Sequence, residues 1–296
     1  MAKVLPAYKI QLHFSKTFLL FSQDIPSQNL GFVNPKLVTL DLNIAGKDYV
    51  IHQSPTILHR PGSTTGAVVW KITPLVADWL AASGNPLWTS NILSSSSAVL
   101  ELGCGISGLV GLVLAPSVGR YTLTDQSYVA RLVEKNIDEN SPLRNSKQTG
   151  TTSQKRKGKS SNVQAKANLQ FLPLDWELDE VTPALTGSDQ VKSFDLVIAC
   201  DCIYNDALIQ PLVQTCADAC KLRSIDKNDA ERPTVCLVAQ QLRDPEIFEG
   251  WIKEFSKYFR VWRVPDKALS EELRTNPGFV VHLGILQNAP EMRHQS

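Results

Sequence analysis

VLELGCGISG, residues 99–108, opens with an apolar run and continues through three closely spaced glycines. Val99-Leu100-Glu101-Leu102 predicts a buried strand, and the apolar residues from Leu109 to Leu114 predict a helix after the turn. Glycine is needed between the two because the backbone there approaches a ligand with no Cβ in the way. The spacing G-x-G-x-x-G also occurs in dinucleotide-binding folds, so the turn indicates an adenosine-type cofactor. A tight turn that binds nothing is the alternative.

Apolar strands and helical patterns alternate on both sides of this turn. Strands are predicted at 121–124, 171–174, 194–200, 234–239 and 279–286, and helices at 66–82, 128–140 and 245–258. The run from Phe194 to Cys200 is nearly all apolar, which suits a parallel sheet covered on both faces. Alternating strands and helices therefore predict an open α/β sheet.

The region before this body predicts a β-hairpin. Residues 38–44 alternate apolar and polar side chains with period two, residues 45–48 form a turn signal, and residues 49–51 continue the pattern. We therefore expect an N-terminal extension with a β-hairpin at residues 1–65, followed by the α/β domain at residues 66–296.

The overall composition is that of a globular chain without a strong net charge. The 296 residues are 43% hydrophobic and 20% charged, enough for a sizeable core, which excludes a disulfide mini-protein. Thirty Lys plus Arg against 29 Asp plus Glu give a formal charge of +1. The whole molecule therefore has no field that would hold nucleic acid or anionic lipid, and any basic surface is local.

Residues 141–168 concentrate the positive charge. They contain seven Lys and Arg residues, no acidic residue and no aromatic residue. Removing these seven charges from the total of +1 leaves −6 for the rest of the chain. A segment of this kind cannot offset its ordering entropy by burying apolar surface, so it predicts a flexible, solvated insertion. Contact with the ribosome or with RNA is the alternative, and KRKGK at 155–159 also fits a nuclear address.

Six cysteines lie mostly within apolar stretches, and residues 1–20 lack the pattern of a secretory signal. We therefore expect a reduced cytoplasmic or nuclear protein. The most apolar windows end well short of the roughly 20 residues that span a bilayer, so no membrane contact is expected. Cys200, Cys202, Cys216 and Cys220 could in principle hold zinc, but without turn residues beside them they fit buried small hydrophobes better, and we expect no metal.

Acidic residues stand at three successive predicted strand ends. Glu101 precedes the glycines, where a carboxylate accepts from a cationic amino group or orients the loop. Asp125 ends the next strand and can accept from both hydroxyls of a ribose. Asp175 and Trp176 follow the third strand, where a carboxylate and a flat ring could hold an adenine, although Trp176 also fits ordinary packing at the rim. S-adenosylmethionine carries a sulfonium and an ammonium in place of the pyrophosphate of a dinucleotide, so these acids favour it.

With these motifs the chain resembles the seven-strand class I methyltransferases, and within them the family 16 protein-lysine methyltransferases. The resemblance rests on GAVVW at 66–70, ELGCGISG at 101–108, TDQ at 124–126, LDW at 174–176 and FDLVIACDCIY at 194–204. It covers about residues 36–288 and implies a Rossmann-like sheet of seven strands with the last one antiparallel. TTGAVVWKITPLVADWL at 64–80 and TDQ look most like the fungal ribosomal protein lysine methyltransferases.

The resemblance also implies site residues. The cofactor would be S-adenosylmethionine, and the residues lining it would be Trp70, Glu101, Gly103, Cys104, Gly105, Asp125, Trp176 and Cys200. Asp201 and Tyr204 would face the acceptor lysine of a ribosomal or other translation-related protein. Two departures are the long basic segment and Cys200, where family members often have alanine.

Other interpretations of the same residues stay open at this point. Asp201 could simply cap the helix that follows it, a common position for aspartate. A nucleotide-dependent dehydrogenase is disfavoured because no Tyr-x-x-x-Lys or His dyad follows the sheet. A cofactor-binding interaction or assembly module without turnover is disfavoured because Asp201 and Tyr204 are both present.

Overall fold

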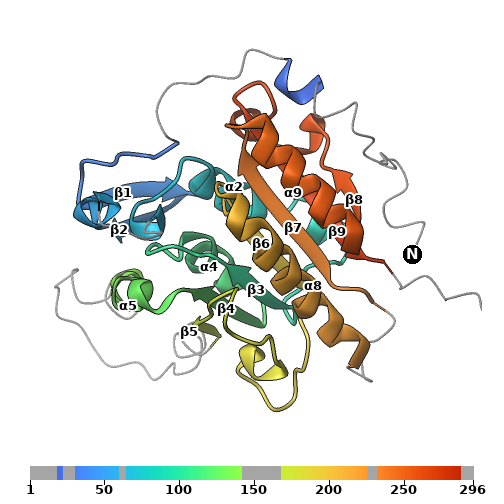
Figure 1. Ribbon diagram of the computed structural model, residues 1–296. Helices are drawn as coiled ribbons and strands as arrows, with labels where there is room; N and C mark the ends of the chain where they lie inside the picture. The colour runs from blue at the N-terminus through green and yellow to red at the C-terminus, as the bar shows by residue number, and fades with distance from the viewer. Residues whose placement is uncertain (1–18, 23–30, 60–64, 142–167, 226–231, 288–296) are drawn as a thin grey trace, which may run out of the picture.

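The computed structural model describes residues 19–22, 31–59, 65–141, 168–225 and 232–287 and contains a seven-stranded sheet (Figure 1). In spatial order the strands are β5 (Leu169–Pro173), β4 (Arg120–Asp125), β3 (Ala98–Leu102), β6 (Leu196–Cys200), β7 (Val235–Gln241), β9 (Phe279–Leu286) and β8 (Phe259–Arg263). The first five are parallel, and β9 runs antiparallel to both of its neighbours. The predicted seven-stranded sheet with an antiparallel last strand is confirmed.

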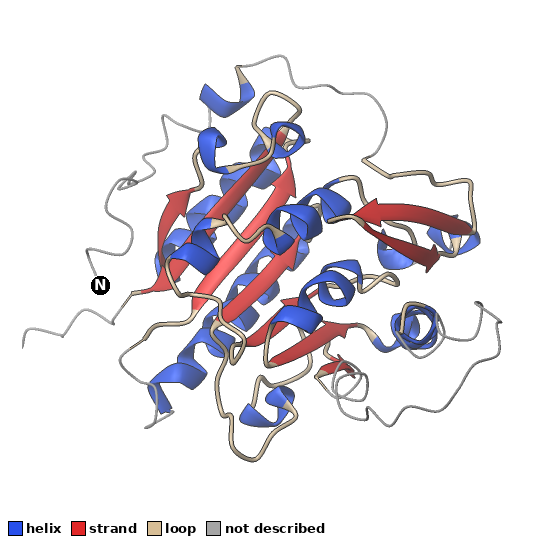
Figure 2. Ribbon diagram, turned by 180° about the vertical axis from the view of Figure 1, so that it is seen from behind, coloured by secondary structure: helices blue, strands red, loops and turns tan. Residues whose placement is uncertain are grey.

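Helices cover both faces of this sheet. One face carries α2 (Ile72–Ala81), α4 (Leu109–Leu114) and α5 (Ala130–Glu139), and the other carries α8 (Ile209–Ile225) and α9 (Pro245–Tyr258), as the two opposite views show (Figures 1 and 2). Along β6, Leu196 and Ile198 belong to the hydrophobic core under α2, α4 and α5, while Val197 and Ala199 belong to the core under α8 and α9. A strand with both faces buried has no polar alternation, which explains the uninterrupted apolar run.

The predicted hairpin consists of β1 (Thr39–Ile44) and β2 (Lys47–His52), paired antiparallel. Its turn is shorter than the expected 45–48, because Ala45 and Gly46 both adopt positive φ and connect the strands in two residues. The apolar side chains of the hairpin pack into the core beneath α2, and its β2 edge lies against α5. The division of the chain at residues 65 and 66 stays a prediction.

The expected helix at 66–82 is wrong in its first part. Residues 65–67 form a short 3₁₀ helix, and α2 begins only at Ile72. The carbonyl of Gly66 accepts a hydrogen bond from the amide of Ile106 at 2.8 Å, so this segment is fixed by the glycine turn instead of by helical bonding. Strand β8, which follows α9 directly, and the bounds of α8 were not predicted.

The basic segment at 141–168 lies outside the described residues except for its two ends, Ser141 and Asn168. Among the helices that the structure describes, none combines the length and apolar character needed to cross a membrane.

Candidate active site

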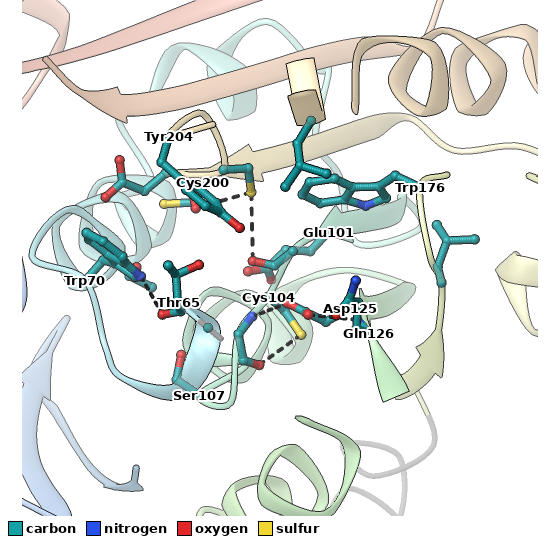
Figure 3. Close-up of a pocket in the computed structure, with 18 of the residues that line it drawn as sticks. Thr65, Trp70, Glu101, Cys104, Ser107, Asp125, Gln126, Trp176, Cys200 and Tyr204 are labelled. Atoms are coloured by element: carbon teal, nitrogen blue, oxygen red, sulfur yellow. Dashed lines mark hydrogen bonds between the residues drawn. The ribbon is translucent and has the colours of Figure 1, made fainter. Parts of the chain in front are cut away.

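A pocket opens at the carboxyl ends of β3, β4, β5 and β6, where the sequence places its acidic residues (Figure 3). Its empty space, counted together with the open mouth, is about 860 Å³. All the predicted site residues line it, namely Trp70, Glu101, Gly103, Cys104, Gly105, Asp125, Asp175, Trp176, Cys200, Asp201 and Tyr204. The structure therefore brings the whole predicted set together.

The glycine turn forms the floor of the pocket. Its backbone conformation excludes larger residues. Gly103 has φ +68°, and a Cβ there would lie 2.7 Å from the sulfur of Cys202 and 3.1 Å from the ring of Trp176. Gly105 has φ +59° and would meet the carbonyl of Gly66 at 3.1 Å. Cys202, Trp176 and Gly66 therefore pack directly against the bare backbone of the turn.

Glu101 is buried in the wall of the pocket, with only 1% of its surface exposed. The hydroxyl of Tyr121, on the neighbouring β4, donates a hydrogen bond to its carboxylate at 2.6 Å. Burial raises the pKa of Glu101 to about 7, and the bond from Tyr121 only partly opposes this. A cation beside this carboxylate would restore its ionised form, so the position suits a positively charged ligand group.

Asp125 ends β4 and fixes the turn. Its Oδ2 accepts from the amide of Gly105 at 2.9 Å and its Oδ1 from the amide of Gln126 at 2.7 Å. Burial raises the pKa of Asp125 to about 6 against the effect of these two bonds. Each carboxylate oxygen has further acceptor capacity, which two ribose hydroxyls could use.

Asp175 and Trp176 follow β5 and form the opposite wall. The Oδ1 of Asp175 accepts from the amide of Glu177 at 2.9 Å, which shapes the loop. The indole nitrogen of Trp176 is buried and has no hydrogen-bond partner in the described part of the chain. An unpaired buried donor is costly, so a ligand acceptor at this wall would be favourable.

Cys200 ends β6 and Asp201 follows it, and the contacts of Asp201 contradict its interpretation as a helix cap. The Asp201 carboxylate does not cap the following helix: it accepts two bonds from the guanidinium of Arg243 and one from the amide of Gln241. The next turn is capped instead by Asn205, whose side chain accepts from the amide of Ala207. The capping interpretation of Asp201 is therefore wrong.

Aromatic rings border this end of the pocket. Trp70 donates from its indole nitrogen to the carbonyl of Thr65 at 3.1 Å, and its ring contacts Phe32 with centroids 4.4 Å apart. Tyr204 and Trp70 both stand at the same side in Figure 3, and Tyr128 lines the pocket near Gly66. Burial raises the pKa of Tyr128 above its usual value, so its phenol stays protonated.

The sequence did not single out several residues of the site. These are Thr65, Gly66, Thr73, Gln126, Tyr128 and Cys202 in the lining and Gln241 and Arg243 behind it. A signal for Arg243 did exist, because it follows the strand predicted at 234–239, and the carboxyl ends of parallel strands lie at the same edge as Asp201. Among the described residues, no group of three His, Cys, Asp or Glu residues could hold a metal ion.

The pocket fits S-adenosylmethionine by its donor set. A buried carboxyl with a raised pKa suits an ammonium, a strand-end aspartate suits a ribose, and an unpartnered indole N–H stands beside them. A Cβ on Gly103 would collide with Cys202 and Trp176, so glycine is what lets these two side chains pack against the turn. Within the ranges that the structure describes, no Lys, Arg or His side chain lines the pocket.

Residues 52–240, more than half of the chain, match the model of a family described as lysine methyltransferase. The chain belongs to the lysine methyltransferase family. This confirms the family that the motifs indicate, and with it the enzyme class. The dehydrogenase and the non-catalytic module are not favoured.

Two curated relatives and one solved structure illustrate the similarity. The ribosomal lysine N-methyltransferase 5 of Zygosaccharomyces rouxii is 33% identical over 225 residues, covering 70% of this chain and 70% of that protein. A diaminohydroxyphosphoribosylamino-pyrimidine deaminase of Schizosaccharomyces pombe is 31% identical over 236 residues, covering 79% of this chain and 48% of that protein. The present chain thus spans about half the length of the Schizosaccharomyces pombe protein. A tRNA (uracil-54, C5)-methyltransferase of Pyrococcus abyssi, solved with S-adenosyl-L-homocysteine, has a TM-score of 0.40 and 14% identity over 85% of this chain and 44% of that chain.

Proposed function

We propose that this chain transfers a methyl group from S-adenosylmethionine to the side-chain nitrogen of a lysine in a ribosomal protein, in the cytoplasm or nucleus. The family match supports lysine methylation, and the ribosomal target is supported by the name of the Zygosaccharomyces relative. The observation that carries the proposal is the pair of buried carboxyls, Glu101 and Asp125, at adjacent strand ends under a glycine turn.

Four residues would hold the cofactor. Glu101 would face its ammonium, Asp125 would accept from its ribose hydroxyls, and Asp175 with Trp176 would border its adenine. When bound, S-adenosylmethionine supplies a methyl carbon attached to a positively charged sulfur. The backbone of the glycine turn would lie against it, because Gly103, Cys104 and Gly105 line the pocket.

The acceptor amine must be neutral before it can attack. A lysine with an unperturbed pKa near 10.4 loses its proton at pH 7 at a cost of about 4.6 kcal/mol, at roughly 1.36 kcal/mol per pH unit. Trp70 and Tyr204 line the pocket and would border the lysine side chain, and partial burial there would disfavour its charged form. We assign Asp201 to orientation of the amine and Tyr204 to the wall, with the proton leaving to water.

Labelling tests this proposal. Purified protein is incubated with radiolabelled S-adenosylmethionine and ribosomal proteins from cells that lack lysine methylation, and label is sought on lysine after hydrolysis. Asp125→Ala should raise the cofactor dissociation constant, and Asp201→Ala should remove most turnover with cofactor affinity nearly intact. Asp189→Ala, at an exposed carboxylate outside the pocket, is the matched control. Equal label from Asp125→Ala and the control, or label absent from lysine, would contradict the proposal.

The basic segment at 141–168 is proposed as a contact for ribosomal RNA. Its support is charge alone: seven cations stand on a chain whose remainder carries −6.

A further inference from the structure

The carboxylate of Asp201 accepts three hydrogen bonds from the protein and keeps acceptor capacity for one more. Arg243 donates from Nη1 to Oδ1 at 2.9 Å and from Nη2 to Oδ2 at 2.5 Å, and the amide of Gln241 donates to Oδ1 at 3.1 Å. The Asp201 side chain is fully buried, while 27% of the Arg243 side chain is exposed. A bidentate pair of this kind fixes both position and charge.

Arg243 is itself held between two elements. Its guanidinium lies over the ring of Trp70, 4.6 Å from the centroid, at the start of α2. Beside it, Gly31 has φ +77°, and a Cβ there would lie 2.6 Å from Nη2 of Arg243, so a larger residue would displace the guanidinium. Asp201 adopts φ +59°, a conformation that an L-residue keeps only when its surroundings hold it.

The charges of this pair cancel where the acceptor lysine would enter. An unpaired carboxylate within about 4–6 Å of an amine raises the pKa of the amine by roughly 1–3. It thereby stabilises the ammonium form, which cannot attack. Paired with Arg243, the same carboxylate orients the amine without that penalty. The pair therefore does what a lone aspartate could not do.

We propose that Arg243 is a positioning residue that neutralises Asp201 and so keeps the acceptor end of the pocket free of net negative charge. This inference rests on the proposed function, since it concerns the same lysine. It makes charge balance between Asp201 and Arg243 the property that sets how easily the bound lysine becomes neutral.

Other titratable groups surround the pair, and none of them is changed in the variants of the test. Cys200 and Cys202 flank Asp201, and burial raises the pKa of both thiols. Tyr204 stands in the same lining, and Glu101 lies on β3. Burial also holds the pKa of Glu101 near 7, so turnover must be measured at saturating cofactor to separate its titration from that of the acceptor.

The substrate is a peptide that contains the lysine labelled in the experiment above. The test compares the pH dependence of kcat, at saturating cofactor and peptide, in four variants of the full chain. Arg243→Gln should shift the rising limb of the kcat profile to higher pH by about 1 pH unit, which corresponds to about tenfold lower kcat at pH 7. It should also lower the KM for the peptide. Asp201→Asn should shift the limb to lower pH, because the positive charge of Arg243 is then no longer compensated. The double variant should return the limb to its wild-type position even if its kcat is lower. Arg260→Gln, at an exposed arginine on β8, is the matched control.

Several outcomes would overturn this inference. An Arg243→Gln limb that coincides with that of Arg260→Gln would assign Arg243 a purely structural role, as would a double variant displaced as far as Arg243→Gln. If Arg243→Gln does not fold, Arg243→Lys decides: it keeps the charge and should keep the wild-type limb, and a displaced limb contradicts the inference. A wild-type protein that labels no lysine refutes the proposed function instead, so the two failures are distinguishable.

Discussion

Glu101 and Asp125 make cofactor affinity depend on pH in one direction. Burial raises their pKa values to about 7 and about 6, so part of each carboxyl is protonated near neutrality. An ammonium and two ribose hydroxyls favour the ionised forms, so binding must release protons. We expect the association constant for S-adenosylmethionine to be full above pH 7 and to fall as pH drops through 7 and 6. Calorimetry in two buffers of different ionisation enthalpy measures both the affinity and the released proton.

Glu101→Gln separates the two groups. It should weaken binding at pH 8 and remove the part of the dependence near pH 7, leaving the step near pH 6 that belongs to Asp125. Glu134→Gln, at an exposed position on α5, should change neither. Affinity that stays constant from pH 8 to pH 5.5 in the wild type would contradict the role of both carboxyls.

Sequence reasoning located the site residues better than their partners. Glu101, Asp125 and Trp176 were predicted because each follows an apolar run, and a parallel sheet brings such positions to one edge. Arg243 was not predicted because its pairing with Asp201 joins residues 42 apart and depends on a left-handed turn at Asp201. The place of Arg243 after the fifth predicted strand indicates the edge of the sheet, but a hydrogen bond across strand ends leaves no local pattern that identifies the partner.

At the scale of elements, the hairpin is attached to the glycine turn through α5. Asn136 is fully buried; its side chain accepts from the amide of His52 at 2.8 Å and donates to the carbonyls of His52 and Ile106 at 2.9 and 2.8 Å. Asn136→Ala would remove these three bonds, which involve the partly buried backbone of His52 and the buried carbonyl of Ile106. We expect the free energy of unfolding to fall by about 3 kcal/mol and cofactor affinity to fall with it, since Ile106 belongs to the turn.

Asn140→Ala is the matched control for this prediction. Its side chain pairs with the amide and carbonyl of Val50 on the hairpin and with the carbonyl of Asn136, not with the turn. Urea unfolding should show a smaller loss, and calorimetry should show unchanged cofactor affinity. Equal effects on affinity from both variants would mean that Asn136 does not couple the hairpin to the site.

Elements were predictable where one face or both faces were plainly apolar. β6 and α9 follow directly from their patterns, whereas the start of α2 did not. Residues 66–71 contain helix-compatible side chains, but the carbonyls of Gly66 and Val69 bond to Ile106 and Val33 from other segments. Tertiary hydrogen bonds overrode local propensity there, and β8 was missed because a five-residue edge strand carries little signal.

On the scale of the whole molecule, charge divides the chain into two parts. The body carries −6 in formal charge and the segment at 141–168 carries +7, so RNA phosphates would be repelled by one and attracted by the other. Composition alone predicts this division, since it needs no fold. The same composition cannot tell attraction to RNA from simple solvation, because both follow from clustered cations.

Salt dependence separates these two roles of the basic segment. If it binds ribosomal RNA, deletion of residues 142–167 should weaken binding to ribosomal particles and flatten the fall of log affinity with log salt by about 0.7–0.9 for every phosphate that the segment neutralises. Methylation of a free peptide should stay unchanged, because the pocket lies among described residues outside the segment. A variant with the basic residues replaced by Gln keeps the length and isolates charge. If it binds particles as the wild type does at every salt concentration, the segment is solvated and the ribosome is recognised by the acidic body.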